Sequence, residues 1–168
     1  HPIISDTNIS PARLETTSDG NIWIVGRFYQ SINLDVGLSN FTLIATPNIY
    51  QFFVAKYDKN GIFLTGKKFG ASNQFINIPE IIADRNNNLI IAGNFNLPAD
   101  LGLGAPNLTY TPNNTSSFIL KIDSNANVKW VVPCIGLGIN NFLVEYITLD
   151  TSDNLLFTAR GVNDSIRL

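Results

Sequence analysis

The chain has 168 residues and a net charge of −2; 45% of its residues are hydrophobic, only 14% are charged, and its mean hydropathy is +0.11. No apolar run approaches the roughly 20 residues of a membrane-spanning helix, and no basic stripe is present to neutralise nucleic-acid phosphates or anionic lipid. We therefore expect no membrane span and no nucleic-acid partner. The apolar excess predicts strands buried on both faces, or a surface that another unit covers. The absence of methionine, even at position 1, leads us to expect a processed protein or a fragment.

The predicted elements are short β-strands separated by turns rich in Asn, Asp and Gly, residues that tolerate positive φ and bond their own backbone. No segment has sustained helical periodicity. In chain order, the clearest predicted strands cover residues 13–17, 53–58, 79–84, 89–95, 117–122, 128–132 and 144–150.

These strands belong to an internal repeat. Residues 19–28 match 86–95 at an offset of 67, while 35–37 match 100–102 and 53–58 match 118–123 at an offset of 65. A third copy begins near residue 147. Four strands per repeat, with a period in the mid-sixties, are typical of a propeller blade. A two-sheet sandwich is the rival, but it would not predict hairpins that recur in order.

The predicted fold is therefore all-β and β-propeller-like, with two four-stranded antiparallel blades plus the first hairpin of a third, an incomplete propeller. We predict an N-terminal extension over residues 1–11, blade 1 over 12–78, blade 2 over 79–143 and the first hairpin of blade 3 over 144–168. Such a segment leaves apolar faces and strand edges bare. We expect the rest of the same polypeptide, other copies or a protein partner to cover them.

Residues 20–28, 34–37 and 53–61 together resemble the bacterial SBBP-type β-propeller repeat, whose units combine a Gly-Asn turn, an aromatic and β-branched strand, an Asp-x-Gly segment and an Asn-Gly turn. The second repeat keeps this order, but Ala126 stands where the first has Gly61. The resemblance implies a secreted or cell-surface bacterial protein, sometimes one exported by the type IX secretion route. It implies no single activity, because such repeats are scaffolds.

Few residues of this chain point to catalysis. The only cysteine, Cys134, lies in an apolar run and is predicted to be buried, and the only histidine is His1, so no nucleophile and base are available as a set. Most acidic residues occupy turn positions. Glu80 and Glu145 are the best candidates for a glycosidase-type carboxylate pair, but their apparent equivalence across repeats, with Ala12 in the first, indicates a structural position. We predict no enzymatic activity.

Metal and cofactor sites are also not predicted. The turns at 58–61 and 123–127 resemble fragments of a calcium loop, but they lack its further acidic ligands, and one Cys and one His cannot build a zinc site.

Two long connections, residues 29–51 and 96–116, are the most plausible binding surface, because loops carry binding while a sheet holds them. The alternative is a short hairpin that edges each blade. The aromatic residues there would stack on sugar rings or pack against their own blade. The candidate binding residues are Tyr29, Asp35, Phe41, Tyr50, Asp100 and Tyr110.

The sequence as a whole predicts a non-catalytic repeat segment that acts as a protein–protein interaction scaffold. Two alternatives remain open: a carbohydrate-binding propeller, and the non-catalytic part of a larger glycan-acting enzyme.

Overall fold

The computed structural model describes residues 9–35, 37, 39–70, 76–96, 99–101, 109–110, 115–134 and 142–161. All regular structure in these ranges is β-strand, so the all-β prediction is confirmed there, and no helix suited to crossing a bilayer is found among them. The strands are β1 (Ser10–Thr16), β2 (Ile22–Tyr29), β3 (Ser31–Asn33), β4 (Thr42–Ile44), β5 (Tyr50–Tyr57), β6 (Phe63–Phe69), β7 (Ile76–Ala83), β8 (Leu89–Phe95), β9 (Ala99–Asp100), β10 (Thr109–Tyr110), β11 (Ser116–Ile122), β12 (Val128–Cys134), β13 (Phe142–Leu149) and β14 (Leu155–Gly161).

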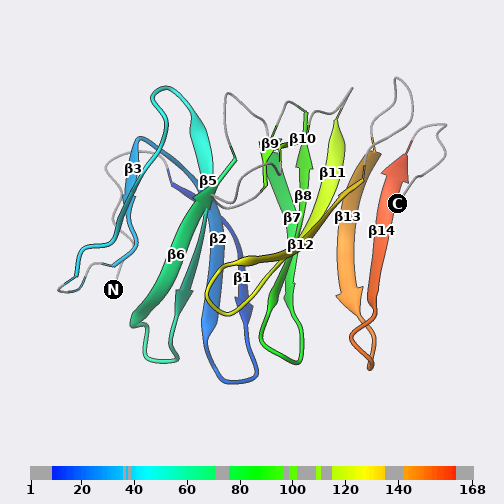
Figure 1. Cartoon of the computed structure of the whole chain (residues 1–168), viewed down its shortest axis with the longest axis horizontal. Coiled ribbons are helices and arrows are strands. Elements are labelled where there is room, and N and C mark those ends of the chain that lie inside the picture. Colours follow the sequence, from blue (N-terminus) through cyan, green and yellow to red (C-terminus); the bar gives the residue numbers. More distant parts are fainter. Residues whose placement is uncertain are drawn as a thin grey trace.

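The strands form three successive units (Figure 1). Sheet 1 has the order β1-β2-β5-β6, sheet 2 has the order β12-β11-β8-β7, and β13 pairs with β14 as hairpin 3. All strand pairs are antiparallel. Within each four-stranded sheet two hairpins join through the pairing of their neighbouring strands, β2 with β5 and β8 with β11. The short ladders β3–β4 and β9–β10 lie in the two long connections, as the alternative of an extra short hairpin predicted.

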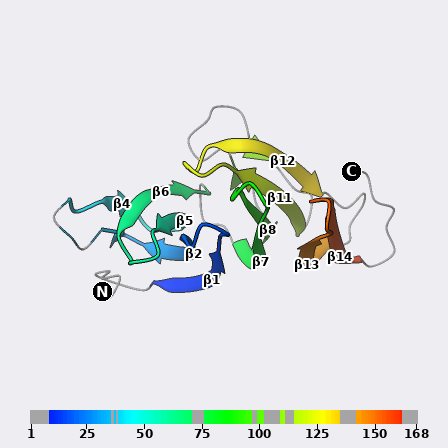
Figure 2. The same ribbon diagram turned by 90° about the horizontal axis from the view of Figure 1, so that it is seen from below.

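The three units stack on one another through apolar faces. One core cluster combines Trp23 and Val25 of sheet 1 with Ile81, Leu89 and Phe118 of sheet 2. A second cluster combines sheet 2 with hairpin 3. The first strands of the units, β1, β7 and β13, lie in a row along one side of the molecule, with β6 and β12 opposite (Figure 2).

Stacking on both sides explains the apolar composition. Every residue of β8 is buried, and so is almost every residue of β11, because sheet 1 covers one face of these strands and hairpin 3 covers the other. Both strands consequently read as continuous hydrophobic runs instead of alternating ones.

The hairpin turns share one backbone conformation. Each has five residues, and the fourth has positive φ: Gly20, Gly61, Asn87, Ala126 and Asp153. In four of the turns an Asp comes first, and its carboxylate accepts hydrogen bonds from the backbone N–H groups two and four residues later; these residues are Asp58, Asp84, Asp123 and Asp150. The conformation requires positive φ even where the sequence has no glycine, as at Ala126, whose φ is 61°.

The first turn differs from the others by an exchange of residues. Thr17 occupies the first position of this turn, where the other four turns have Asp. The carboxylate of the turn belongs instead to Asp19, which accepts a hydrogen bond from the Thr17 hydroxyl. In sheet 2 the equivalent of Thr17 is Asp84, which is buried and whose carboxylate lies 2.6 Å from Lys121 Nζ. Burial alone would raise the pKa of Asp84, but the hydrogen bonds from Lys121 and Asn88 together outweigh it and hold the pKa below its ordinary value.

Removing Lys121 should therefore destabilise the fold much more than removing its equivalent in sheet 1, Lys56. Lys121→Met leaves a buried carboxylate without its cation, and we expect a loss of about 3 kcal/mol in the free energy of unfolding. Lys56 lies 5.3 Å from the Trp23 ring centre and donates to Ser124 O at 3.5 Å, so Lys56→Met leaves no such carboxylate and should cost less than half as much. Urea unfolding at pH 7 measures both variants, and equal losses would contradict this account.

Stability should also fall in acid because of the turn carboxylates. The backbone N–H of Ile62, then that of Asn60, lowers the pKa of Asp58, and the Asn154 side chain does the same for Asp150. A carboxyl group with a depressed folded-state pKa stabilises the fold above its unfolded pKa of about 3.9, and this stabilisation is lost as pH falls through the folded pKa. We expect the urea concentration at the unfolding midpoint to decrease as the pH is lowered below about 4. The decrease should be smaller in Asp58→Asn than in the wild-type chain. A midpoint unchanged between pH 6 and pH 3 would rule this out.

Candidate functional site

The first strand of every unit carries a β-bulge at the same distance from its turn. The register shifts between Pro11 and Arg13 in β1, between Asn77 and Glu80 in β7, and between Val144 and Tyr146 in β13. A bulge adds one residue to a strand and redirects the side chains around it, and bulges are enriched beside functional sites.

Pairing across each hairpin shows which residues are equivalent. Arg13 pairs with Val25, Glu80 with Ala92 and Tyr146 with Thr158, each four residues before the first residue of its turn. Arg13, Glu80 and Tyr146 are therefore equivalent. The expected equivalence of Glu80 and Glu145 with Ala12 is wrong, because Glu145 and Ala12 are the extra residues of their bulges and lie one residue before the positions that match Glu80.

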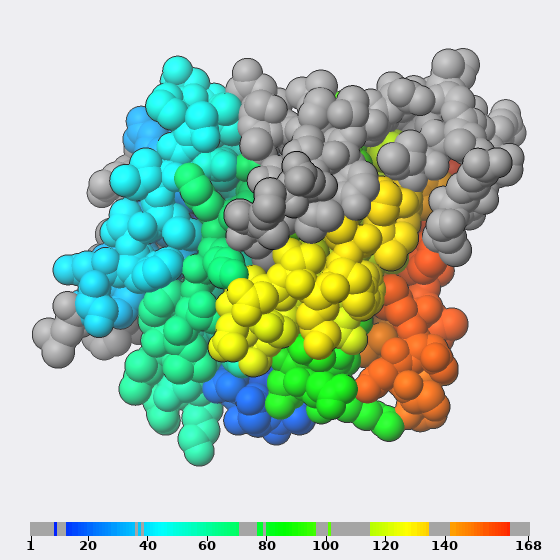
Figure 3. All heavy atoms as spheres, in the orientation of Figure 1, coloured from blue at the N-terminus to red at the C-terminus, as the bar shows by residue number. Residues whose placement is uncertain are grey.

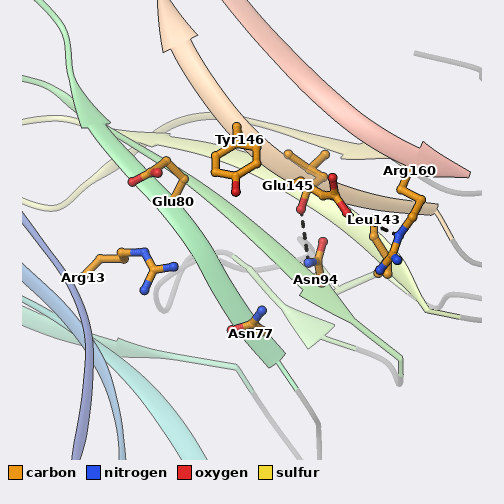
Figure 4. Close-up of a pocket in the computed structure, with 9 residues that line it drawn as sticks. Arg13, Asn77, Glu80, Asn94, Leu143, Glu145, Tyr146 and Arg160 are labelled. Atoms are coloured by element: carbon orange, nitrogen blue, oxygen red, sulfur yellow. Dashed lines mark hydrogen bonds and ion pairs between the residues drawn. The ribbon is translucent and has the colours of Figure 1, made fainter.

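These bulges border a pocket of about 380 Å³ at the edge formed by β1, β7 and β13 (Figure 4). The figure shows side chains entering it from different strands, with Arg13, Glu80 and Tyr146 coming from the three successive units. The pocket is lined by Arg13, Asn77, Glu80, Asn94, Leu143, Val144, Glu145, Tyr146 and Arg160.

The charges of the pocket are balanced. Glu145 and Arg160 form an ion pair across hairpin 3, with Arg160 Nε 3.3 Å from Glu145 Oε1. Arg13 and Glu80 contribute one further charge of each sign. Glu80 and Glu145, the carboxylates that the sequence singled out, thus line the same pocket, although they occupy different positions of the repeat.

A buried polar network holds hairpin 3 against sheet 2 behind the pocket. The Ser117 hydroxyl lies 2.6 Å from Asn94 Oδ1 and 2.9 Å from Phe142 O, and it accepts a hydrogen bond from the Val144 N–H at 2.7 Å. Asn94 Nδ2 donates to Val144 O at 3.2 Å. Since both side chains are buried, this network fixes where β13 lies, and with it the pocket wall.

The binding residues predicted in the first long connection do not lie in this pocket. The Tyr29 and Tyr50 rings are 5.1 Å apart at the end of the β2–β5 ladder, the Arg27 guanidinium lies 5.3 Å from the Tyr50 ring centre, and the Tyr29 hydroxyl donates to Asn48 Oδ1. These residues form one aromatic surface, which remains a predicted site.

The other predicted residues have different settings. Asp35 accepts a hydrogen bond from the Gly37 N–H, and Phe41 stacks on Phe63 with ring centres 4.8 Å apart, so both serve the conformation of their own connection. The side chains of Asp100 and Tyr110 lie outside the described residues.

Sequence reasoning missed Arg13, Asn77, Asn94, Tyr146 and Arg160. Each is a polar or amphipathic residue inside a strand. One signal in the sequence could have found three of the pocket residues. Arg13, Glu80 and Tyr146 each lie four residues before the first residue of the next turn, and counting back from the turns brings them into alignment.

The described part of the chain offers neither an activated nucleophile nor a cluster of metal ligands. Cys134 is buried, as predicted, and burial raises the pKa of its thiol to about 11, which disfavours the nucleophilic thiolate. Among the described residues, no group of three or more His, Cys, Asp or Glu side chains is placed to hold a metal ion.

The Ser117 network gives a direct test of what positions the pocket wall. Ser117→Ala removes the hydroxyl that the Val144 N–H and Asn94 Oδ1 both bond, and we expect a loss of about 1–3 kcal/mol in the free energy of unfolding. Hydrogen exchange should accelerate selectively at Val144. Ser18→Ala, at an exposed turn, is the control and should change neither quantity appreciably. Unchanged exchange at Val144 in Ser117→Ala would show that apolar contacts alone hold hairpin 3.

Comparisons with known proteins supply no family for this arrangement. No protein-family model matches the chain, and no curated protein matches it. The resemblance to the SBBP-type repeat therefore rests on the residues quoted for it and on their order.

Proposed function

We propose that the chain is a non-catalytic β-propeller-type repeat segment of a secreted or cell-surface bacterial protein, and that it acts through contacts with another protein chain. The location follows from the resemblance to the SBBP-type repeat. The stacking of units with their first strands side by side supports the propeller-type arrangement, because successive blades must meet in this way. The observation that carries the proposal is a bare sheet face at one end of the stack, where an apolar residue occupies a position that the other two units bury.

This bare face belongs to hairpin 3. By pairing register, Trp23 of sheet 1, Ile90 of sheet 2 and Leu156 of hairpin 3 are equivalent. Trp23 and Ile90 are buried by the following unit, whereas Leu156 is 53% exposed. Hairpin 3 thus carries an apolar residue at the position through which sheets 1 and 2 contact their following units, although no described residue covers Leu156.

The opposite end of the stack presents the complementary face. Leu14 of sheet 1 is equivalent to Ile81 and Ile147, both of which are buried against the preceding unit. Leu14 is 61% exposed. In the space-filling view, sheet 1 with its β3–β4 hairpin and hairpin 3 form the two ends of the molecule (Figure 3).

The two bare faces occupy complementary positions of the repeat. Only β13 and β14 form hairpin 3, so its face is two strands wide. At the other end, Ile32, Leu34 and Leu43 of the β3–β4 connection cover Phe53 and Ala55 of β5, which leaves the region around Leu14 uncovered. We therefore assign the partner as a second copy of this chain, whose Leu14 face docks on the Leu156 face in the way that units already dock inside the chain. Such a head-to-tail contact closes into a ring or extends into a filament.

Self-association should depend on both faces. We expect light scattering to give a mass above 18.5 kDa that rises with concentration for the wild-type chain. Leu156→Lys and Leu14→Glu should each remain monomeric, because a charge would be buried without a partner. An equimolar mixture of the two variants should form a dimer again, since the intact Leu156 face of Leu14→Glu then meets the intact Leu14 face of Leu156→Lys.

Ile62→Lys is the matched control, because Ile62 is an aliphatic residue with the same 61% exposure as Leu14 and lies in the turn between β5 and β6. It should associate like the wild-type chain. A wild-type chain that stays monomeric at several hundred micromolar, or an equal effect of Ile62→Lys, would overturn the proposed contact.

A further inference from the structure

The pocket at the three bulges carries an inference that goes beyond the proposed docking face. Four residues before each turn, at a position that lines the pocket, the three units have Arg13, Glu80 and Tyr146. At the following position they have Leu14, Ile81 and Ile147. Packing between units requires the same residue type at the second position. The pocket position instead carries three different side chains, each able to form hydrogen bonds, which is the pattern expected of a surface that recognises a ligand.

The charge balance restricts the class of ligand. The pocket contains two guanidinium groups, Arg13 and Arg160, and two carboxylates, Glu80 and Glu145. Arg160 is already neutralised by Glu145 at 3.3 Å. A site for phosphate or a carboxylate would have an excess of positive charge, and a site for a cation an excess of negative charge. The balance favours a ligand without net charge.

The hydrogen-bonding groups restrict it further. Guanidinium groups only donate, carboxylates only accept, and the Asn77 amide and the Tyr146 phenol do both. Donors and acceptors that alternate over a small area match a molecule whose groups are each donor and acceptor, as hydroxyls are. Tyr146 is 64% exposed, so its ring is also available to contact the apolar face of a sugar ring.

We infer that this pocket, at the bulges of β1, β7 and β13, is a binding site for a neutral saccharide, with Glu80, Asn77 and the Glu145–Arg160 pair bonding its hydroxyls and Tyr146 contacting its ring. The volume of about 380 Å³ lies at the small end of ligand sites and suits one or two sugar units.

The test is a titration of the full ¹⁵N-labelled chain with lactose, cellobiose, maltose and N,N′-diacetylchitobiose, followed by amide chemical shifts. At least one disaccharide should shift the amides of residues 77–80 and 143–146. Tyr146→Ala and Glu80→Gln should weaken its binding at least about fivefold. Leu64→Ala removes an exposed apolar side chain of β6 outside the pocket and should leave the affinity unchanged, whereas Tyr50→Ala tests the aromatic surface of the first long connection.

Several outcomes would overturn the inference: no shifts with any of these sugars, loss of binding in Tyr50→Ala but not in Tyr146→Ala, or tighter binding of glucuronate or inorganic phosphate than of any neutral sugar. Repeating the titration on Leu156→Lys separates this site from the proposed self-association, because every pocket residue comes from one chain and binding should persist. Hydrolysis of the disaccharide would support the binding site while contradicting the non-catalytic assignment.

Discussion

The arrangement of the whole chain depends on the burial of sheet 2 on both faces. Fully burying a large aliphatic or aromatic side chain stabilises a fold by about 1.5–3 kcal/mol, and β8 and β11 bury such side chains toward both neighbours. By contrast, the exposed contact between Arg85 and Asp153, at 3.8 Å, belongs to a class worth about 0–1 kcal/mol. Sheet 1 and hairpin 3 must therefore cover the two faces of sheet 2. Once they do so in register, β1, β7 and β13 lie side by side and their bulges meet at one edge.

The two contacts between units solve the same problem with different chemistry. At one position, sheet 1 has Phe52, which packs in the apolar cluster against sheet 2, while sheet 2 has Ser117, which bonds the backbone of β13. Apolar contact is non-directional, so it fixes the separation of two sheets better than their register. The Ser117 hydroxyl donates a hydrogen bond to Phe142 O and accepts one from the Val144 N–H, and these bonds fix the register as well. Hairpin 3 has only two strands with which to hold its place, so it gains most from such directional bonds.

The parts of this fold that the sequence predicts well are the strands whose residues and turns recur at a regular spacing along the chain. The strand predicted over residues 89–95 coincides with β8, because its ends are set by turn residues and its interior by uninterrupted burial. The pocket was not predictable in the same way. The offset of 65 residues that relates 53–58 to 118–123 also relates Glu80 to Glu145, but the turns after β7 and β13 begin 66 residues apart, at Asp84 and Asp150, so Glu80 corresponds to Tyr146. A sequence shows which side chains a strand carries, but only pairing with the next strand shows where an inserted residue lies.

The long connections show a second limit of the sequence. Tyr29 and Phe41 were both reasonable binding residues by type and location, yet Phe41 stacks on Phe63, while Tyr29 pairs with Tyr50. Aromatic residues in a loop are ambiguous because the same ring that would bind a sugar also provides the apolar area that holds the loop on its sheet. The distinction requires knowledge of which neighbour each ring has.

The proposed docking face and the proposed saccharide pocket meet at one residue. Tyr146 pairs with Thr158, and by strand alternation its side chain emerges on the same face of hairpin 3 as Leu156, while it also lines the pocket. A unit docked on that face would reduce the exposure of the Tyr146 ring and extend the pocket wall beyond hairpin 3. Any effect of docking on saccharide affinity must be matched by an equal effect of saccharide on docking, since coupling between two binding equilibria is reciprocal. The bulge of β13 thus places one side chain where assembly and ligand recognition would act on each other.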